Sequence, residues 1–259
     1  MGTPIIAWQA ACNTVGMIGV FDSGVGGLTV LRALRRRMPA SDFLYIADTA
    51  HAPYGCKPAG VVNGYACAIA DQLCERGAHA IVVACSTASA TALPELRRRC
   101  RVPVWGMIDA GVEAATRATR GGSIGVIGTQ ATIGNGAYQR RLEALGHRVW
   151  AHACPMLVRV AEEGRANSPE AVLLAQNYLV ARPEIDTLIL GCTHFPLLRR
   201  AIQRAAGKDV RLVDGAEGVA EEVSEALGRT SGSGRVERIA TGDAVNFQRE
   251  RSAVRAALR

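Results

Sequence analysis

Apolar residues follow two patterns along the chain, and their alternation predicts an α/β fold. Short, continuous apolar runs are typical of parallel strands that are buried on both faces. Longer segments between them, such as 61–77 and 169–180, place apolar residues at helical spacing. Because strands that alternate with helices form mainly parallel sheets, we predict such sheets here. The predicted strands are 18–21, 43–48, 80–84, 102–108, 124–128, 188–191, 210–214 and 239–243.

Two of these strands lead directly into a cysteine. The runs are AIVVACST at 80–87 and LILGCTH at 188–194, and Cys85 and Cys192 are 107 positions apart. The first strands of the two halves, IGVFDS from residue 18 and IGVIGT from residue 124, repeat at an offset of 106. We interpret this register as an internal duplication. The fold class that follows is α/β, with two similar lobes related by internal pseudo-symmetry.

Each lobe then presents one cysteine at the carboxyl end of a strand, which is where open α/β sheets hold their ligands. Two thiols that face one site from opposite sides suit one chemistry well. One thiolate takes a proton from a carbon, and the other thiol returns a proton to the opposite face. The alternative is that Cys85 and Cys192 are small buried residues that only fill the core. Their repetition in the same context favours a site between the lobes.

The other cysteines do not indicate a redox centre or a metal centre. The chain has 8 cysteines but no CxxC pair, and no cysteine and histidine spacing is typical of zinc. We expect free thiols, no metal and no cofactor. The 259 residues contain no apolar run of about 18 residues and no signal peptide at Met1, so we expect a cytoplasmic protein.

The net charge of +7 comes from an arginine-rich composition. Arginines cluster at 35–37, 97–99 and 140–141, each near the end of a helical pattern, where cations complement the helix dipole. A solvated surface explains them, and attraction of an anionic substrate or of nucleic acid is the alternative. An aromatic content of 5% offers no stacking platform for single strands.

Three loops supply further candidate chemistry. The glycine-rich loop DSGVGG begins at Asp22 and permits close approach of an anion to the backbone, although Asp22 could also be only a turn or cap residue. Tyr54 and Gly55 follow the second strand and offer a phenol and an open backbone N–H. Glu162 belongs to an acidic pair that could influence a thiol, although most such pairs are solvated.

The duplication also divides the chain. Residues 1–16 precede the first convincing strand and are predicted to be an N-terminal extension. We assign 17–108 together with 218–259 to the first lobe and 109–217 to the second. The last strand, at 239–243, is expected to return to the first lobe.

Five blocks of this sequence resemble the cofactor-independent aspartate/glutamate racemase family, and glutamate racemases in particular. They are FDSGVGGLT from residue 21, ADTA from 47 with PYG from 53, ACSTA from 84, GVIGT from 125 and GCTHFPLL from 191. The resemblance implies that Cys85 takes the α-proton of D-glutamate and that Cys192 takes that of L-glutamate. It implies that Asp22 supports Cys85 and that His194 supports Cys192, with Glu162 as a further acidic site residue. The substrate contacts that it implies are Asp22, Ser23, Tyr54, Gly55, Ser86, Thr87, Thr193 and His194.

Two positions depart from the family pattern. Ser86 stands where the family usually has asparagine, which shortens the side chain and removes the amide's donors and acceptor. His51 stands where arginine is common. Ser86 puts substrate choice and rate in question, but it leaves the two-thiol chemistry intact.

The expected function is therefore racemisation of glutamate, which supplies D-glutamate for peptidoglycan. One alternative is a racemase of the same superfamily that acts on aspartate or another amino acid. A different class of protein, which keeps the fold but binds nucleic acid without catalysis, ranks lower because both thiols, Asp22 and His194 are present. As partners we expect glutamate and a second copy of the chain in a homodimer, with no membrane and no nucleic acid.

Overall fold

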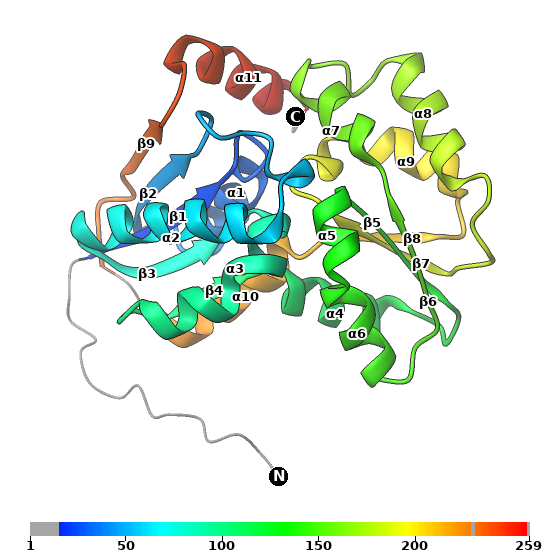
Figure 1. Cartoon of the computed structure of the whole chain (residues 1–259), viewed down its shortest axis with the longest axis horizontal. Coiled ribbons are helices and arrows are strands. Elements are labelled where there is room, and N and C mark those ends of the chain that lie inside the picture. The colour runs from blue at the N-terminus through cyan, green and yellow to red at the C-terminus, as the bar shows by residue number, and fades with distance from the viewer. Residues whose placement is uncertain (1–15, 229–230, 258–259) are drawn as a thin grey trace.

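The strands form two separate, entirely parallel sheets, which lie side by side in the computed structural model (Figure 1). The structure describes residues 16–228 and 231–257, so the predicted N-terminal extension lies outside it except for Gly16. The five-stranded sheet has the order β4-β3-β1-β2-β9, and the four-stranded sheet has the order β6-β5-β7-β8. The strands are β1 Met17–Asp22, β2 Asp42–Ala47, β3 Ala78–Val83, β4 Val104–Gly106, β5 Ile124–Gly128, β6 Val149–Ala153, β7 Thr187–Gly191, β8 Arg211–Val213 and β9 Val236–Ala240.

Helices connect these strands and cover both faces of the sheets (Figure 1). In the first half they are α1 Leu28–Arg37, the 3-10 turn η1 Tyr54–Cys56, α2 Ala59–Glu75, α3 Ser86–Arg99 and α4 Met107–Ala118. In the second half they are α5 Gln130–Asn135, α6 Ala137–Ala144, α7 Pro155–Glu162, α8 Pro169–Leu179, the 3-10 turn η2 Phe195–Leu198, α9 Arg199–Ala206, α10 Ala216–Leu227 and α11 Ala244–Ala257.

The two sheets repeat one strand order, which confirms the predicted duplication. The order β4-β3-β1-β2 in the first sheet corresponds to the order β8-β7-β5-β6 in the second. Each strand of the second sheet lies about 106 residues after its counterpart in the first. The pairing extends beyond the strands, because Asp48 N donates to Asp22 O at 2.9 Å and Cys154 N donates to Gly128 O at 2.8 Å. Within residues 16–228 and 231–257, strand β9 has no counterpart in the second sheet.

The continuous apolar runs arise because the central strands are covered on both faces. Along β1, Val20 belongs to the core beneath α1 and α10, whereas Phe21 belongs to the core beneath α2 and α3. Successive strand residues point to opposite faces, so each residue of such a strand must be apolar. Their burial fixes the positions of the strand ends, and these ends carry Asp22, Cys85 and Cys192.

Several predicted elements differ at their ends. The predicted strand 102–108 contains only β4, because Met107 begins α4. Two short helices, α5 and α6, meet at Gly136, whose φ of +74° suits glycine. Pro196 lies in the 3-10 turn η2, which precedes α9.

The C-terminal segment returns to the first sheet, as predicted. Strand β9 lies parallel to β2 with Phe43 opposite Val236. Helix α11 then runs toward α7, and Phe247 and Val254 are buried in the same core as Leu157 of that helix (Figure 1). The proposed boundaries at residues 108 and 218 stay a prediction.

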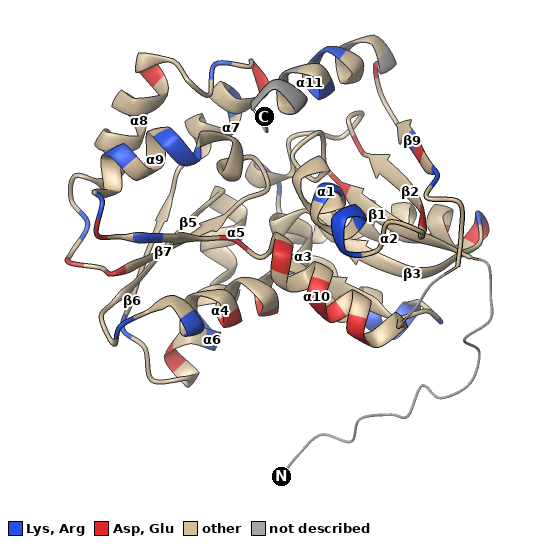
Figure 2. Cartoon of the chain, turned by 180° about the vertical axis from the view of Figure 1, so that it is seen from behind, with Lys and Arg blue, Asp and Glu red and all other residues tan. Residues whose placement is uncertain are grey.

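Carboxylates on neighbouring helices pair with several of the clustered arginines (Figure 2). Arg36 and Arg37 at the end of α1 pair with Glu217 and Glu221 of α10, and Arg99 at the end of α3 pairs with Asp71 at 2.6 Å. These contacts are those of a solvated, ion-paired surface. In the described ranges, no helix has the length and apolarity needed to cross a bilayer.

Candidate active site

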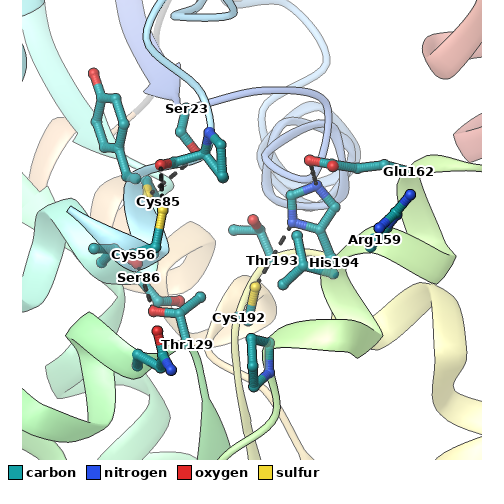
Figure 3. A pocket seen from close by; sticks show the side chains of 17 residues that line it. Ser23, Cys56, Cys85, Ser86, Thr129, Arg159, Glu162, Cys192, Thr193 and His194 are labelled. Atoms are coloured by element: carbon teal, nitrogen blue, oxygen red, sulfur yellow. Dashed lines mark hydrogen bonds and ion pairs between the residues drawn. The ribbon is translucent and has the colours of Figure 1, made fainter. Parts of the chain in front are cut away.

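A cavity of about 270 Å³ lies where the carboxyl ends of strands from both sheets meet. Cys85 follows β3 of the first sheet and Cys192 follows β7 of the second. Both sulfur atoms face the space between the sheets in Figure 3. The duplication thus brings its two equivalent cysteines to the walls of one cavity, as the sequence predicted.

Cys85 is enclosed and largely protonated. Its side chain lies at the N-terminus of α3, and its thiol donates to Ser23 Oγ at 3.8 Å. Burial raises the pKa of Cys85 to about 12, and the negative charge of Asp22 adds to this rise. The backbone hydrogen bond at Ala88 and the contact with Ser23 oppose the rise only in part. The Cys85 thiol therefore holds its proton at neutral pH.

This protonation state predicts slow, pH-dependent alkylation of Cys85. Only thiolate reacts with iodoacetamide, and a pKa near 12 leaves roughly one thiol in 10⁵ ionised at pH 7. We expect the rate at Cys85 to rise about tenfold per pH unit from pH 7 to 10, measured by mass spectrometry of its peptide. Cys56, an exposed residue at the same cavity, is the reference for reagent access. A rate that levels off below pH 9 would contradict the assignment.

Cys192 faces a buried histidine that a carboxylate supports. His194 Nδ1 lies 3.7 Å from Cys192 Sγ, and His194 Nε2 lies 3.2 Å from Glu162 Oε1 (Figure 3). Burial by itself lowers the pKa of His194, but hydrogen bonds to Cys192 and Glu162 and their negative charges outweigh it. The net effect raises the pKa of His194 well above its usual value. The two thiols therefore have different partners despite their equivalent places in the fold.

Asp22 lies beneath the cavity and organises the glycine-rich loop. Its fully buried carboxylate accepts hydrogen bonds from Gly24 N at 3.2 Å and Gly27 N at 3.0 Å, and Thr193 Oγ1 lies 3.4 Å away. Asp22 is not among the residues that line the cavity, whereas its neighbour Ser23 is. Asp22 can therefore influence Cys85 in two ways: through its negative charge, and by fixing the position of Ser23, which contacts the Cys85 thiol.

Gly26 brings the glycine-rich loop against the second lobe. A Cβ placed on Gly26 would lie 2.4 Å from Thr193 Oγ1 and 2.8 Å from His194 Nδ1. Both contacts are shorter than van der Waals separation, so a Cβ at this position must displace the side chains of Thr193 and His194 beside Cys192. We expect Gly26→Ala to lower kcat/KM by about tenfold and to destabilise the fold by about 1–3 kcal/mol, as overpacking does.

Steady-state kinetics and thermal unfolding test this prediction. The control is Gly134→Ala in α5, where a Cβ would meet no atom within 4 Å. If Gly26→Ala matched the parent in both measurements, the close approach would not matter to the site.

The remaining predicted contacts reach the cavity together. Tyr54, Gly55, Ser86, Thr87 and Thr193 all line it. Their roles toward a substrate stay predictions. Ser86 follows Cys85 directly and is 5% exposed. Because Ser86 lines the cavity, the presence of serine where the family usually has asparagine changes the cavity wall itself.

Sequence reasoning missed part of the wall. Thr129 of the second lobe lines the cavity, and its hydroxyl lies 2.9 Å from Thr87 Oγ1 and 2.9 Å from Thr132 Oγ1, which links the lobes. The repeat contained the signal for it, because Thr129 is the counterpart of Ser23 at the offset of 106. Seven lining residues were not predicted: Pro53, Cys56, Thr129, Gln130, Pro155, Val158 and Arg159.

Comparison with known proteins places this geometry in a family. Residues 18–223 match the Asp/Glu/Hydantoin racemase family. The chain is 49% identical over 233 residues to a protein named glutamate racemase from Thermus thermophilus, and the match covers 87% of each chain. It is 44% identical over 232 residues to a glutamate racemase from Aquifex pyrophilus, covering 89% of this chain and 91% of the relative.

A solved structure gives the same result for the fold. The crystal structure of glutamate racemase from Thermus thermophilus in complex with β-chloro-D-alanine superposes with a TM-score of 0.85 at 45% identity. The superposition covers 92% of this chain and 93% of that one. The fold and these matches define an α/β racemase of the two-lobed type. The chain belongs to the Asp/Glu/Hydantoin racemase family.

Proposed function

We propose that the protein is a glutamate racemase that uses Cys85 and Cys192 as its two acid/base groups. The observation that carries this proposal is the placement of two buried thiols on one cavity, one from each duplicated lobe. The glutamate racemase relatives, at 44% and 49% identity over most of the chain, support glutamate as the substrate. The product D-glutamate would supply peptidoglycan synthesis, which is the role of this family.

The reaction needs one proton to leave Cα and another to arrive on the opposite face. With L-glutamate, the Cys192 thiolate takes the α-proton, and the electron pair of the broken C–H bond is shared with the substrate carboxylate. The Cys85 thiol then gives its proton to the opposite face of Cα, which leaves Cys85 as thiolate and the product as D-glutamate. The reverse reaction begins from that thiolate, so protons and charges balance in both directions.

The surrounding groups reduce the cost of the charge that develops on the substrate. The α-hydrogen is far less acidic than a thiol, so the intermediate must be stabilised by donors placed in advance. Ser86 and Thr87 begin α3, where backbone N–H groups and the positive end of the helix dipole favour an anion. The hydroxyls of Thr129 and Thr193 also line the cavity. Exclusion of water between the lobes strengthens each of these interactions.

The two cysteines have different surroundings. Cys85, with a pKa of about 12, holds its proton, whereas Cys192 lies 3.7 Å from His194 Nδ1, a group that can exchange a proton with it. Glu162 lies on the other side of His194 from Cys192 and stabilises positive charge on the imidazole ring.

The experiment is racemisation of L- and D-glutamate followed by circular dichroism, without added cofactor, beside L- and D-aspartate. We expect turnover of both glutamate enantiomers and little of either aspartate enantiomer. Aspartate turnover without glutamate turnover would move the assignment to another member of the family and point to Ser86. No amino-acid turnover, together with salt-dependent binding of DNA, would support the binding-protein alternative.

The proposal also includes a cytoplasmic location and a homodimer. The seven cysteines in the described part of the chain are free thiols, which suits a reducing compartment. Sedimentation of the purified protein measures the oligomeric state, and a monomer that racemises at full rate would exclude the dimer as a requirement.

A further inference from the structure

A buried carboxylate outside the cavity holds one of the cavity's side chains. Asp48 follows β2, is 1% exposed and accepts a hydrogen bond from Tyr54 Oη at 2.5 Å. His51 Nδ1 lies 2.9 Å from Asp48 Oδ1, and the His51 ring stacks on Tyr65 with centroids 4.0 Å apart. Tyr54 itself is 1% exposed and lines the cavity. Asp48 thus fixes the direction of the Tyr54 ring.

The C-terminal segment supplies the remaining donor to Asp48. Thr241 follows β9, and its hydroxyl donates to Asp48 Oδ1 at 2.6 Å while accepting from Ala50 N at 3.1 Å. Two neighbouring bonds extend the contact, since Thr241 N donates to Ala47 O at 3.0 Å and Gly242 N donates to Thr49 Oγ1 at 2.9 Å. The loop that leads from β2 to Tyr54 is therefore held by residues about 190 positions further along the chain.

Among the described residues, the second lobe has no such arrangement. The counterpart of Asp48 after β6 is Cys154, which makes the equivalent backbone bond but carries no carboxylate. In the same part of the chain, the second sheet also lacks a counterpart of β9. The carboxylate and the strand that supplies its donor therefore occur together, in the lobe whose loop carries Tyr54. The backbone hydrogen bond that Asp48 shares with Cys154 occurs in both lobes. It therefore does not explain why the side chains of Asp48, Tyr54 and Thr241 meet in the first lobe alone among the described residues.

We propose that Thr241 is a positioning residue for the substrate site, which acts through Asp48 to hold Tyr54 in the conformation that receives the substrate. This inference rests on the proposed racemase function. Burial and the hydrogen bond to Asp48 raise the pKa of Tyr54 well above its usual value, so its hydroxyl remains a donor to Asp48. Without the Thr241 hydroxyl, only a fraction of molecules holds Tyr54 correctly, and apparent affinity falls by that fraction.

The test replaces Thr241 with valine, which keeps the shape and removes the hydroxyl, and with serine, which keeps the hydroxyl. We expect Thr241→Val to raise KM for L- and D-glutamate by about five- to tenfold with kcat within about twofold, because saturating substrate selects the competent conformation. Thr241→Ser should stay within about twofold of the parent. Tyr54→Phe should raise KM similarly, and the double variant should be no worse than Tyr54→Phe alone, because both act through one network.

The matched control is Thr119→Val, which removes a threonine hydroxyl that donates to Asp186 at 2.9 Å, away from the cavity in the second lobe. It should leave KM unchanged. The proposal would be overturned if Thr241→Val had the same KM as the parent protein, or if the substitution lowered kcat and left KM unchanged. If Thr241→Val does not fold, a parent KM in Tyr54→Phe overturns it equally.

A measurement without turnover separates this inference from the proposed function. Amide hydrogen exchange over residues 48–56 should be faster in Thr241→Val than in the parent and unchanged in Thr119→Val. If the parent does not racemise glutamate, the proposed function fails while the exchange result still decides whether Thr241 holds the Tyr54 loop. Unchanged exchange in Thr241→Val would overturn the positioning role whether or not the parent is active.

Discussion

Replacing either Cys85 or Cys192 by alanine is expected to abolish racemisation of glutamate, with kcat/KM lowered by about 10³-fold or more. A positioned acid or base contributes about 10²–10⁴-fold to a proton transfer, and each direction of this reaction uses both thiols. The losses must be equal for L- and D-glutamate, because the enantiomers have equal free energy and the ratio of their kcat/KM values is fixed at one.

Cys154→Ala is the matched control for this experiment. Cys154 is also fully buried, its pKa is also raised to about 12 by burial and the nearby Cys192, and it does not line the cavity. Its variant should retain activity within a few-fold of the parent. Substantial racemisation in Cys85→Ala or Cys192→Ala, measured by circular dichroism, would exclude the two-thiol mechanism. Loss in Cys154→Ala equal to the others would mean that general damage to the core explains all three.

Glu162→Gln is expected to lower kcat by about 10²-fold at alkaline pH and to change the shape of the pH profile. Glu162 is one of two groups that raise the pKa of His194 against the effect of burial. Burial lowers the pKa of His194, and the Glu162 charge counteracts this effect. The pKa of His194 therefore falls when that charge is removed. Charge on a histidine is present below its pKa and is lost as the pH rises through it. The alkaline limb of kcat should therefore move to lower pH in the variant.

Glu163→Gln is the control, because Glu163 is adjacent but pairs with Arg159 and Arg165 rather than with His194. Its kcat and its pH profile should match the parent. The two profiles are measured between pH 6 and 10 at saturating glutamate. An alkaline limb that stays in place in Glu162→Gln would show that Glu162 does not act through His194.

The sequence predicted the parts of the site that depend on local pattern. The strands before Cys85 and Cys192 are central and buried on both faces, so each produces a continuous apolar run that ends at a fixed point. Their repeat at offsets of 106 and 107 predicted that both lobes would present equivalent cysteines, and the strand orders confirm the duplication.

Elements at the edges were harder to predict for a physical reason. Strand β6 lies at the edge of its sheet, its residues are partly exposed, and Trp150 and His152 interrupt the apolar pattern. The following helix α7 was therefore missed, together with Pro155, Val158 and Arg159 of the cavity wall. The acidic pair by itself left the role of Glu162 open, because such a pair at a helix end is usually solvated, and the family resemblance favoured Glu162 as a site residue.

The sequence by itself determined the duplicated α/β fold and the place of each candidate residue at a strand end, since these follow from periodicity and from chain order. The tertiary structure decided what each residue experiences. The pKa of Cys85 depends on Asp22, His194 contacts Glu162, and Thr241 contacts Asp48, and the two groups in each case are far apart in the chain. Burial and charge act through distances in space, and those distances exist only once each lobe has folded.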